Sequence, residues 1–169
     1  MTGQSRAAAK AALRPFLPDD APHLADLFRS AIMDLTGEDY DADQQEAWAA
    51  AADDGARFAA GLAAGLTLVA VVDGDPVGFA TLKDGGHLDM LYVAPEVAGM
   101  GIGRLLCDAL ERLAAARGTQ ALSVDSSDTA LGFFQHRGYV AQRRNSVPRA
   151  DVWLANTTLR KTLVPAARS

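Results

Sequence analysis

The sequence contains little cysteine and histidine and lacks a long apolar run. Its one cysteine, Cys107, excludes an internal disulfide. The histidines, His23, His87 and His136, show no metal-ligand spacing, and one thiol cannot complete a zinc site, so we expect no metal. The longest stretch without charge, residues 58–72, contains glycines and is shorter than the ~20 residues that cross a bilayer, so no membrane segment is expected.

Positive charge is also scarce. The chain has 16 Lys and Arg against 21 Asp and Glu, which gives a formal net charge of -5 at pH 7. A negatively charged protein repels the phosphate backbone, so nucleic acid is not an expected partner. Residues 34–54 hold eight carboxylates and no Lys or Arg, so the negative charge is concentrated there.

What the sequence does contain is the composition of a globular domain. Apolar residues make up 49% of the chain and charged residues 22%, and 169 residues suffice for one packed core. We expect a disordered leader over residues 1–11 and a single domain over residues 12–163. The N-terminus has no apolar segment of the kind that secretory signals carry, so a cytoplasmic location is expected.

Hydrophobic periodicity predicts a chain of mixed helices and strands. Apolar runs between turn residues predict strands at 13–17, 66–72, 77–82, 87–93, 122–124, 139–142 and 152–159. Helical spacing predicts helices that follow Pro18, span 41–52, continue in short turns to 64, follow Gly103 to 117 and span 126–136. The tight turns between the second, third and fourth strands predict an antiparallel arrangement in the middle of the chain.

Three glycines, Gly99, Gly101 and Gly103, alternate directly after a strand and directly before a helix. Glycine allows positive φ angles and close backbone approach, so several N–H groups can converge at the positive end of a helix dipole. This pattern predicts a site for an anion such as a pyrophosphate, with a ligand-free turn as the alternative. A dinucleotide-binding fold is disfavoured because its glycines follow the first strand of a βαβ unit, and a Walker loop would end in Gly-Lys-Ser or Gly-Lys-Thr.

Several blocks of the sequence share their pattern with one known family. These are Arg14 near the first strand, Val77-Gly78-Phe79, Leu91-Tyr92-Val93-Ala94-Pro95, Ala98-x-x-Gly101-x-Gly103 and Ala130-x-x-Phe133-Phe134-x-x-x-Gly138-Tyr139. On these blocks the chain resembles the GNAT superfamily of N-acetyltransferases, over about residues 12–163. The resemblance implies an α/β (α+β) fold in which helices flank a mixed, mostly antiparallel central sheet of about seven strands.

The resemblance also implies an enzyme that moves the acetyl group of acetyl-CoA directly to a primary amine of a small molecule or peptide, within a ternary complex. In the family the glycine loop holds the pyrophosphate, which implies that role for Gly99, Met100, Gly101, Ile102, Gly103 and Arg104. The strand before the loop pairs with the pantetheine arm, which implies contacts from Leu91 and Val93. Ser127 falls where the family often has an asparagine that contacts the same arm, with an N-cap of the following helix as the alternative, and Phe134 is expected to pack against the arm.

Two positions depart from the family pattern. Ala98 stands where most members have Gln or Arg, so one polar contact near the phosphates is missing unless Arg104 replaces it. Phe134 stands where many members have a tyrosine that protonates the leaving thiolate, and a phenyl ring has no proton to give. A thiol of pKa ~8.5 leaves readily, so acid assistance is either dispensable or supplied by Ser127, Tyr92 or a water.

The attacking amine must lose a proton, because a lysine-like ammonium has a pKa of about 10.4. His87 and Asp89 are the candidate bases, since both lie on the strand before the loop and His87 falls where some members of the family have a catalytic glutamate. Imidazole titrates near neutrality, as a base requires. The alternatives are an exposed histidine at a strand end and an aspartate that caps or pairs structurally.

The acceptor site is predicted beside the acidic segment. In the superfamily the region between the first two helices forms one wall of that site, and here it contains Tyr40, Gln44 and Trp48. Aromatic rings and carboxylates can hold a cationic amine by charge and cation–π contact. Asn156 of the C-terminal hairpin is a further candidate. The alternative is a solvated acidic helix with Trp48 packed inward.

A second function stays open at this point. With Phe134 in place of tyrosine, the domain can instead be a sensor that binds an acyl-CoA and regulates a partner with little or no turnover. Thiol release with an amine would distinguish the two functions. A homodimer is expected only from the resemblance, because oligomers are common in the superfamily.

Overall fold

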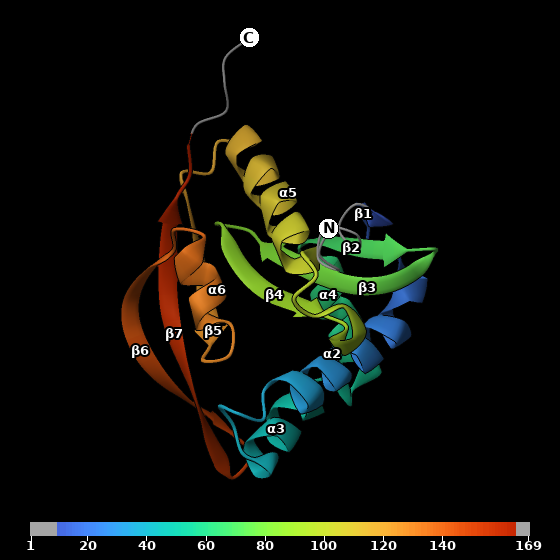
Figure 1. Ribbon diagram of the computed structural model, residues 1–169, viewed down its shortest axis with the longest axis vertical. Coiled ribbons are helices and arrows are strands. Elements are labelled where there is room, and N and C mark those ends of the chain that lie inside the picture. Colours follow the sequence, from blue (N-terminus) through green and yellow to red (C-terminus); the bar gives the residue numbers. More distant parts are fainter. Residues whose placement is uncertain (1–9, 165–169) are drawn as a thin grey trace.

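The computed structural model describes residues 10–164 (Figure 1). Residues 1–9 of the predicted leader lie outside the described residues. Of the leader's last two residues, Lys10 is exposed and Ala11 packs, partly buried, against the core.

One sheet forms the centre of the protein, and its seven strands lie in the order β1-β2-β3-β4-β5-β7-β6. The strands are β1 (Ala12–Pro15), β2 (Leu66–Val72), β3 (Asp75–Lys83), β4 (His87–Val93), β5 (Ala121–Ser127), β6 (Val140–Arg149) and β7 (Val152–Thr162). Neighbours pair antiparallel except β4 and β5, which are parallel. The predicted mixed, mostly antiparallel sheet is confirmed.

Helices cover both faces of the sheet (Figure 1). They are α2 (Ala21–Leu35), α3 (Ala42–Ala49), α4 (Gly55–Ala64), α5 (Ile102–Ala116) and α6 (Leu131–His136), with 3-10 turns η1 (Pro18–Asp20), η2 (Ala50–Ala52) and η3 (Pro95–Val97). None of the helices between residues 10 and 164 combines the length and apolarity that a membrane crossing requires.

Each face of the sheet has its own hydrophobic core. On one face α5 contributes Ile102, Leu106 and Leu110, which pack on β2, β3, β5 and β7. On the other face α2 and α4 pack on β2 and β3 around Phe28 and Phe79. Apolar residues at helical spacing in α2 and α5 give each helix one buried side, as the sequence predicted. The sheet is therefore held rigidly between two helical layers.

The prediction of a helix over residues 126–136 was wrong in its first half. The strand β5 continues to Ser127, and α6 begins only at Leu131. The ladder with β7, which pairs Ser127 with Asn156, outweighs the local helix-start signals. The predicted strands at 139–142 and 152–159 are likewise too short, because β6 and β7 form one long hairpin.

Gly78 of β3 sets how closely α5 approaches the sheet. A Cβ atom at this position would lie 2.8 Å from Ile102 Cγ2 and 3.2 Å from the Tyr92 carbonyl oxygen. Ile102 is 1% exposed, so its branched side chain has little room to move away. The absence of a side chain at Gly78 thus allows the first turn of α5 to pack on β3 and β4.

We therefore expect Gly78→Ala to lower the free energy of unfolding by about 1–3 kcal/mol, because the added methyl overpacks the core. Gly61→Ala in α4 is the matched control, since a Cβ there meets nothing within 4 Å. The control should be neutral or stabilising by about 0.5–1 kcal/mol, because alanine favours a helix over glycine. Chemical denaturation of the two variants measures both changes, and equal effects would contradict the packing argument.

Candidate active site

The two halves of the sheet, β1–β4 and β5–β7, are joined by a very short ladder. The parallel strands β4 and β5 share two residue pairs, His87↔Ser123 and Leu88↔Val124. Beyond them β4 continues to Val93 beside β3, and β5 continues to Ser127 beside β7. The strands therefore part from residue 89 onward (Figure 1), which leaves the backbone groups on that edge of residues 89–93 to a ligand.

A β-bulge at Asp89 marks the point where the strands part. Leu88 and Met90 pair with consecutive residues of β3, so Asp89 is the extra residue. A bulge bends its strand, increases the local twist and re-aims side chains. The alternation of β4 reverses here, because Leu88 and Leu91 both pack in the core beside α5, whereas Met90 packs in the core beside α2.

The glycine loop joins the end of β4 to the N-terminus of α5. Gly99 (φ 74°) and Gly101 (φ 90°) adopt the left-handed conformation that glycine favours, and Gly101 caps α5. The first bond of the helix runs from Leu105 N–H to Gly101 O (3.0 Å). The N–H groups of residues 102–104 therefore have no partner within the helix and lie at its positive end. This geometry suits an anion.

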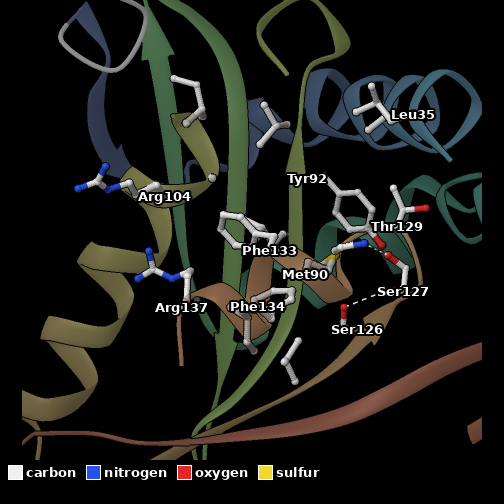
Figure 2. A pocket seen from close by; sticks show the side chains of 18 of the residues that line it. Leu35, Met90, Tyr92, Arg104, Ser126, Ser127, Thr129, Phe133, Phe134 and Arg137 are labelled. Atoms are coloured by element: carbon white, nitrogen blue, oxygen red, sulfur yellow. Dashed lines mark hydrogen bonds between the residues drawn. The ribbon is translucent and has the colours of Figure 1, made fainter. Parts of the chain in front are cut away.

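A cavity of about 1130 Å³ fills the space where the strands part. Its walls come from residues 88–93 of β4, the glycine loop, residues 124–127 of β5 and α6. It extends to Thr36 and Trp48 beside the acidic segment. Figure 2 shows Met90 and Tyr92 of β4, Ser126 and Ser127 of β5, and the two phenylalanines of α6 around this space. The cavity thus connects the anion-binding loop with the predicted acceptor wall.

Nine of the ten predicted cofactor residues, all within the described range, line this cavity. They are Leu91, Val93, Gly99, Gly101, Ile102, Gly103, Arg104, Ser127 and Phe134. The tenth is Met100, whose N–H donates a hydrogen bond to Val97 O (3.1 Å) within the loop. Met100 N–H thus has a partner within the loop, unlike the N–H groups of residues 102–104, which have none within the helix.

The basic side chains of the cavity wall differ in their partners. Arg137 donates to Asp108 (2.8 Å) and Glu111 (2.9 Å), and Lys161 donates to Glu111 (2.6 Å). Within residues 10–164, Arg104 forms no such ion pair, and its side chain is exposed on the first turn of α5. Figure 2 shows Arg104 and Arg137 on the same side of the cavity. Arg104 is thus the cation available to an anionic ligand.

Phe134 lies in the core as well as in the cavity wall. It is 2% exposed, and its ring packs edge-on against Phe133 (5.2 Å) and Tyr139 (5.3 Å between centroids). This placement suits a packing role, and the phenyl ring has no proton to give to a leaving group.

Two other hydroxyl groups line the cavity and have a proton to donate. The indole N–H of Trp48 donates to Tyr92 Oη (3.2 Å), and the N–H of Ala130 donates to Ser127 Oγ (3.1 Å). Each hydroxyl oxygen acts as acceptor in these bonds, so its own proton remains for another acceptor. Burial raises the pKa of Tyr92 well above its usual range, which keeps this hydroxyl protonated.

The predicted acceptor residues fall into two groups. Trp48 lines the cavity and packs edge-on against Tyr40, at 5.4 Å between centroids. The other three form bonds within the protein. Tyr40 Oη donates to Ala155 O (2.7 Å) and accepts from Asp128 N–H (2.9 Å). Gln44 Nε2 donates to Trp153 O (2.8 Å). Asn156 Oδ1 accepts a hydrogen bond from Asn145 Nδ2 (2.9 Å). Tyr40 and Gln44 thus fasten the acidic segment to β7.

The two predicted bases occupy different places. Asp89 lines the cavity and lies 3.3 Å from Lys83 Nζ. His87 lies at the closed end of the gap, with Nδ1 2.8 Å from Ser123 Oγ and Nε2 3.8 Å from an Asp125 carboxylate oxygen. Asp125 lines the cavity on the β5 side and was not predicted from the sequence. The alternation of polar residues at 123, 125 and 127 was its signal, and reading residues 122–124 as the whole strand obscured it.

Metal ligation finds no support among residues 10–164, where no three His, Cys, Asp or Glu side chains gather closely enough to hold an ion.

Comparison with known proteins agrees with this geometry. A family model described as an acetyltransferase (GNAT) domain matches residues 36–162. This chain belongs to the GNAT family of acetyltransferases. The family and enzyme class predicted from the sequence blocks are thereby confirmed.

The similarity to GNAT proteins extends over most of the chain. A GCN5-related N-acetyltransferase of Rhodopseudomonas palustris, known from a crystal structure, is 55% identical with a TM-score of 0.89, and the match covers 91% of this chain and 96% of that one. The uncharacterized N-acetyltransferase YafP of Escherichia coli K12 is 29% identical over 88% of this chain and 93% of its own. PaiA N-acetyltransferase of Thermoplasma acidophilum, solved with coenzyme A, shares the fold at 17% identity (TM-score 0.75, covering 90% and 98%).

Cys107, on the buried side of α5, should be inert in this GNAT protein. It is 1% exposed, and burial raises the pKa of its thiol to about 12. At pH 8 the thiol therefore stays protonated, and the thiolate is the form that reacts. We expect a chromogenic disulfide reagent to react with less than 0.1 equivalent in the native protein, roughly, and with one equivalent in denaturant. Rapid stoichiometric reaction of the native protein would contradict this burial.

Proposed function

We propose that this GNAT acetyltransferase binds acetyl-CoA in the cavity between β4 and β5 and transfers the acetyl group directly to a primary amine within a ternary complex. The parting of β4 from β5, directly beside the glycine loop, carries this proposal. It provides an extended backbone edge, an anion site and an opening toward the acidic segment in one continuous space.

The residues of the cavity suit the chemical parts of the donor. The N–H groups of residues 102–104 and the Arg104 side chain are donors for a pyrophosphate at a helix N-terminus. The free edge of residues 89–93 can pair with the amide groups of a pantetheine arm, as a strand would. An arm that starts at the loop and follows β4 toward Asp89 brings its thioester to the point where the strands part.

The chemistry at that point requires few side chains. The amine nitrogen attacks the thioester carbonyl carbon, a C–N bond forms, the C–S bond breaks, and the nitrogen loses a proton. A backbone N–H on the free edge of β4 can polarise the carbonyl oxygen. The Tyr92 and Ser127 hydroxyls can donate hydrogen bonds to the leaving sulfur. Because burial keeps Tyr92 protonated, it stabilises the thiolate by hydrogen bonding more than by complete proton transfer.

The acceptor is proposed to be a cationic primary amine of a small molecule or peptide. The cavity extends to Thr36 and Trp48, and the segment around them carries the eight carboxylates of residues 34–54. Negative charge at an opening raises the local concentration of a cation. The bases predicted from the sequence for the amine proton are His87 and Asp89.

The direct test follows coenzyme A release with a thiol reagent, using acetyl-CoA and a panel of spermidine, kanamycin, lysine and a lysine-containing peptide. We expect release with at least one amine and none without an amine. Acetyl-CoA binding by calorimetry without any release would favour the sensor function instead, and absence of binding would contradict the cavity assignment.

We expect Arg104→Ala to raise KM for acetyl-CoA by about 3- to 10-fold. The substitution removes a charged hydrogen-bond donor to the pyrophosphate, at an exposed site. Arg112→Ala is the matched control, since Arg112 is exposed on the same helix, two turns further on. It should leave KM unchanged. Steady-state kinetics at one ionic strength measure KM for both variants. An equal change in KM in the two variants would contradict the proposal that Arg104 contacts the pyrophosphate.

We expect Tyr92→Phe to lower kcat by about 10-fold, with KM for acetyl-CoA changed less than about 2-fold, because a donor to the leaving sulfur acts mainly in the transition state. Tyr139→Phe is the control, because its hydroxyl donates to Glu111 instead (3.1 Å). Unchanged kcat in Tyr92→Phe, with Ser127→Ala strongly impaired, would assign the donor role to Ser127.

A further inference from the structure

The face of β5, β6 and β7 that lies opposite α5 and α6 carries a row of polar side chains. On β5, Leu122 and Val124 point into the core beside α5, so Ser123 and Asp125 point to the opposite face. The ladder with β7 places Thr158 opposite Asp125. On the next strand, β6, Asn145 lies opposite Asn156, and its side chain reaches Thr158. A polar network therefore approaches the place where β4 and β5 part.

The hydrogen bonds in this row lead toward one carboxylate. Asn145 Nδ2 donates to Thr158 Oγ1 (2.8 Å), and Thr158 Oγ1 donates to Asp125 Oδ1 (2.5 Å). On the other side of the carboxylate, His87 Nε2 lies 3.8 Å from Asp125 Oδ2, and His87 Nδ1 lies 2.8 Å from Ser123 Oγ. Asp125 is thus held on one oxygen and has a histidine beside the other.

Position distinguishes Asp125 from the other titratable groups nearby. Asp125 stands directly after the last ladder pair, Leu88↔Val124, and lines the cavity with a half-exposed side chain. Asp89, at the bulge of β4, also lines the cavity but lies 3.3 Å from Lys83 Nζ. His87 lies two residues before Asp89 on β4, within the short ladder that joins β4 to β5. A ligand that reaches the end of the cavity meets Asp125 before His87.

We propose that Asp125 is the catalytic residue that binds the acceptor ammonium and accepts its proton, and that His87 and Thr158 are positioning residues that act through Asp125. This inference rests on the proposed acetyl transfer. The ammonium donates a hydrogen bond to the carboxylate, and the proton passes to Asp125 and then to solvent. The neutral amine attacks the thioester, and its second proton leaves with the sulfur as the coenzyme A thiol.

This arrangement assigns the imidazole a different role from a direct base. His87 Nδ1 lies 2.8 Å from Ser123 Oγ and its Nε2 lies 3.8 Å from Asp125 Oδ2, so the ring stands beside the carboxylate and helps to hold it in place. Thr158 fixes the carboxylate so that one oxygen faces the cavity. The network therefore supplies both the charge that selects a cationic amine and the group that takes its proton.

Kinetics of three variants test the assignment, with whichever amine among spermidine, kanamycin and the lysine peptide the wild type acetylates. Asp125→Asn should lower kcat/KM for the amine by about 100-fold or more and leave acetyl-CoA affinity by calorimetry within about 2-fold. Asp75→Asn, at an exposed position of β3, is the control and should retain full activity. His87→Gln should cost less than Asp125→Asn, about 10-fold.

The double variant separates a positioning role from a direct one. If His87 acts through Asp125, Asp125→Asn with His87→Gln should be no slower than Asp125→Asn alone, within about 3-fold. Thr158→Val should lower kcat about 3- to 10-fold, and Thr158→Ser should restore it, because serine keeps the donor. A purely structural role would weaken acetyl-CoA binding in these variants as well.

Other results would overturn the inference in distinguishable ways. Wild-type-like activity of Asp125→Asn, or a larger loss in His87→Gln than in Asp125→Asn, overturns the role of Asp125 while acetyl transfer stands. No coenzyme A release by the wild type with any amine of the panel overturns the proposed function, and the role of Asp125 with it.

Discussion

The site depends on one constraint, which is that β4 pairs with β3 on both sides of the Asp89 bulge but with β5 at two positions only. Unpaired strand edges leave polar backbone groups without partners, so a parting inside a sheet needs a local cause. The bulge at Asp89 supplies it by bending β4 and reversing its alternation. The cavity and the free backbone edge of β4 follow from that bend, and Asp89 and Asp125 both line that cavity.

The glycine loop was predictable because its chemistry is local. Positive φ at Gly99 and Gly101 and a helix that starts at Ile102 are encoded within a few residues, and the same holds for the strand before them. The parting of the strands was not predictable from periodicity, since the bulge depends on register with β3. Asp125 was missed for a related reason. The strand that carries it, β5, extends to Ser127 because it pairs with β7, and this long-range pairing cannot be predicted from the neighbouring residues.

The acidic segment shows the limit of reading side-chain chemistry without geometry. Tyr40 and Gln44 were selected for an aromatic ring and an amide in a carboxylate-rich context, yet their polar groups bond to β7 and to the turn after β5. Burial and the hydroxyl bonds of Tyr40 hold the segment in place, and Trp48 faces the cavity. The carboxylates thus give the segment its charge, whereas Tyr40 and Gln44 hold it in position.

The short ladder between β4 and β5 also concerns the whole protein's resistance to heat and proteolysis. Two backbone pairs connect the sheet halves directly, and side-chain packing and the hydrogen bonds of Tyr40 and Gln44 add to that connection. A donor that pairs with β4 along residues 89–93 would serve as an additional strand and bind the native state alone. Its concentration would then add to the stability of the fold by mass action. The lifetime of the enzyme in a cell would in this way follow the supply of its own donor.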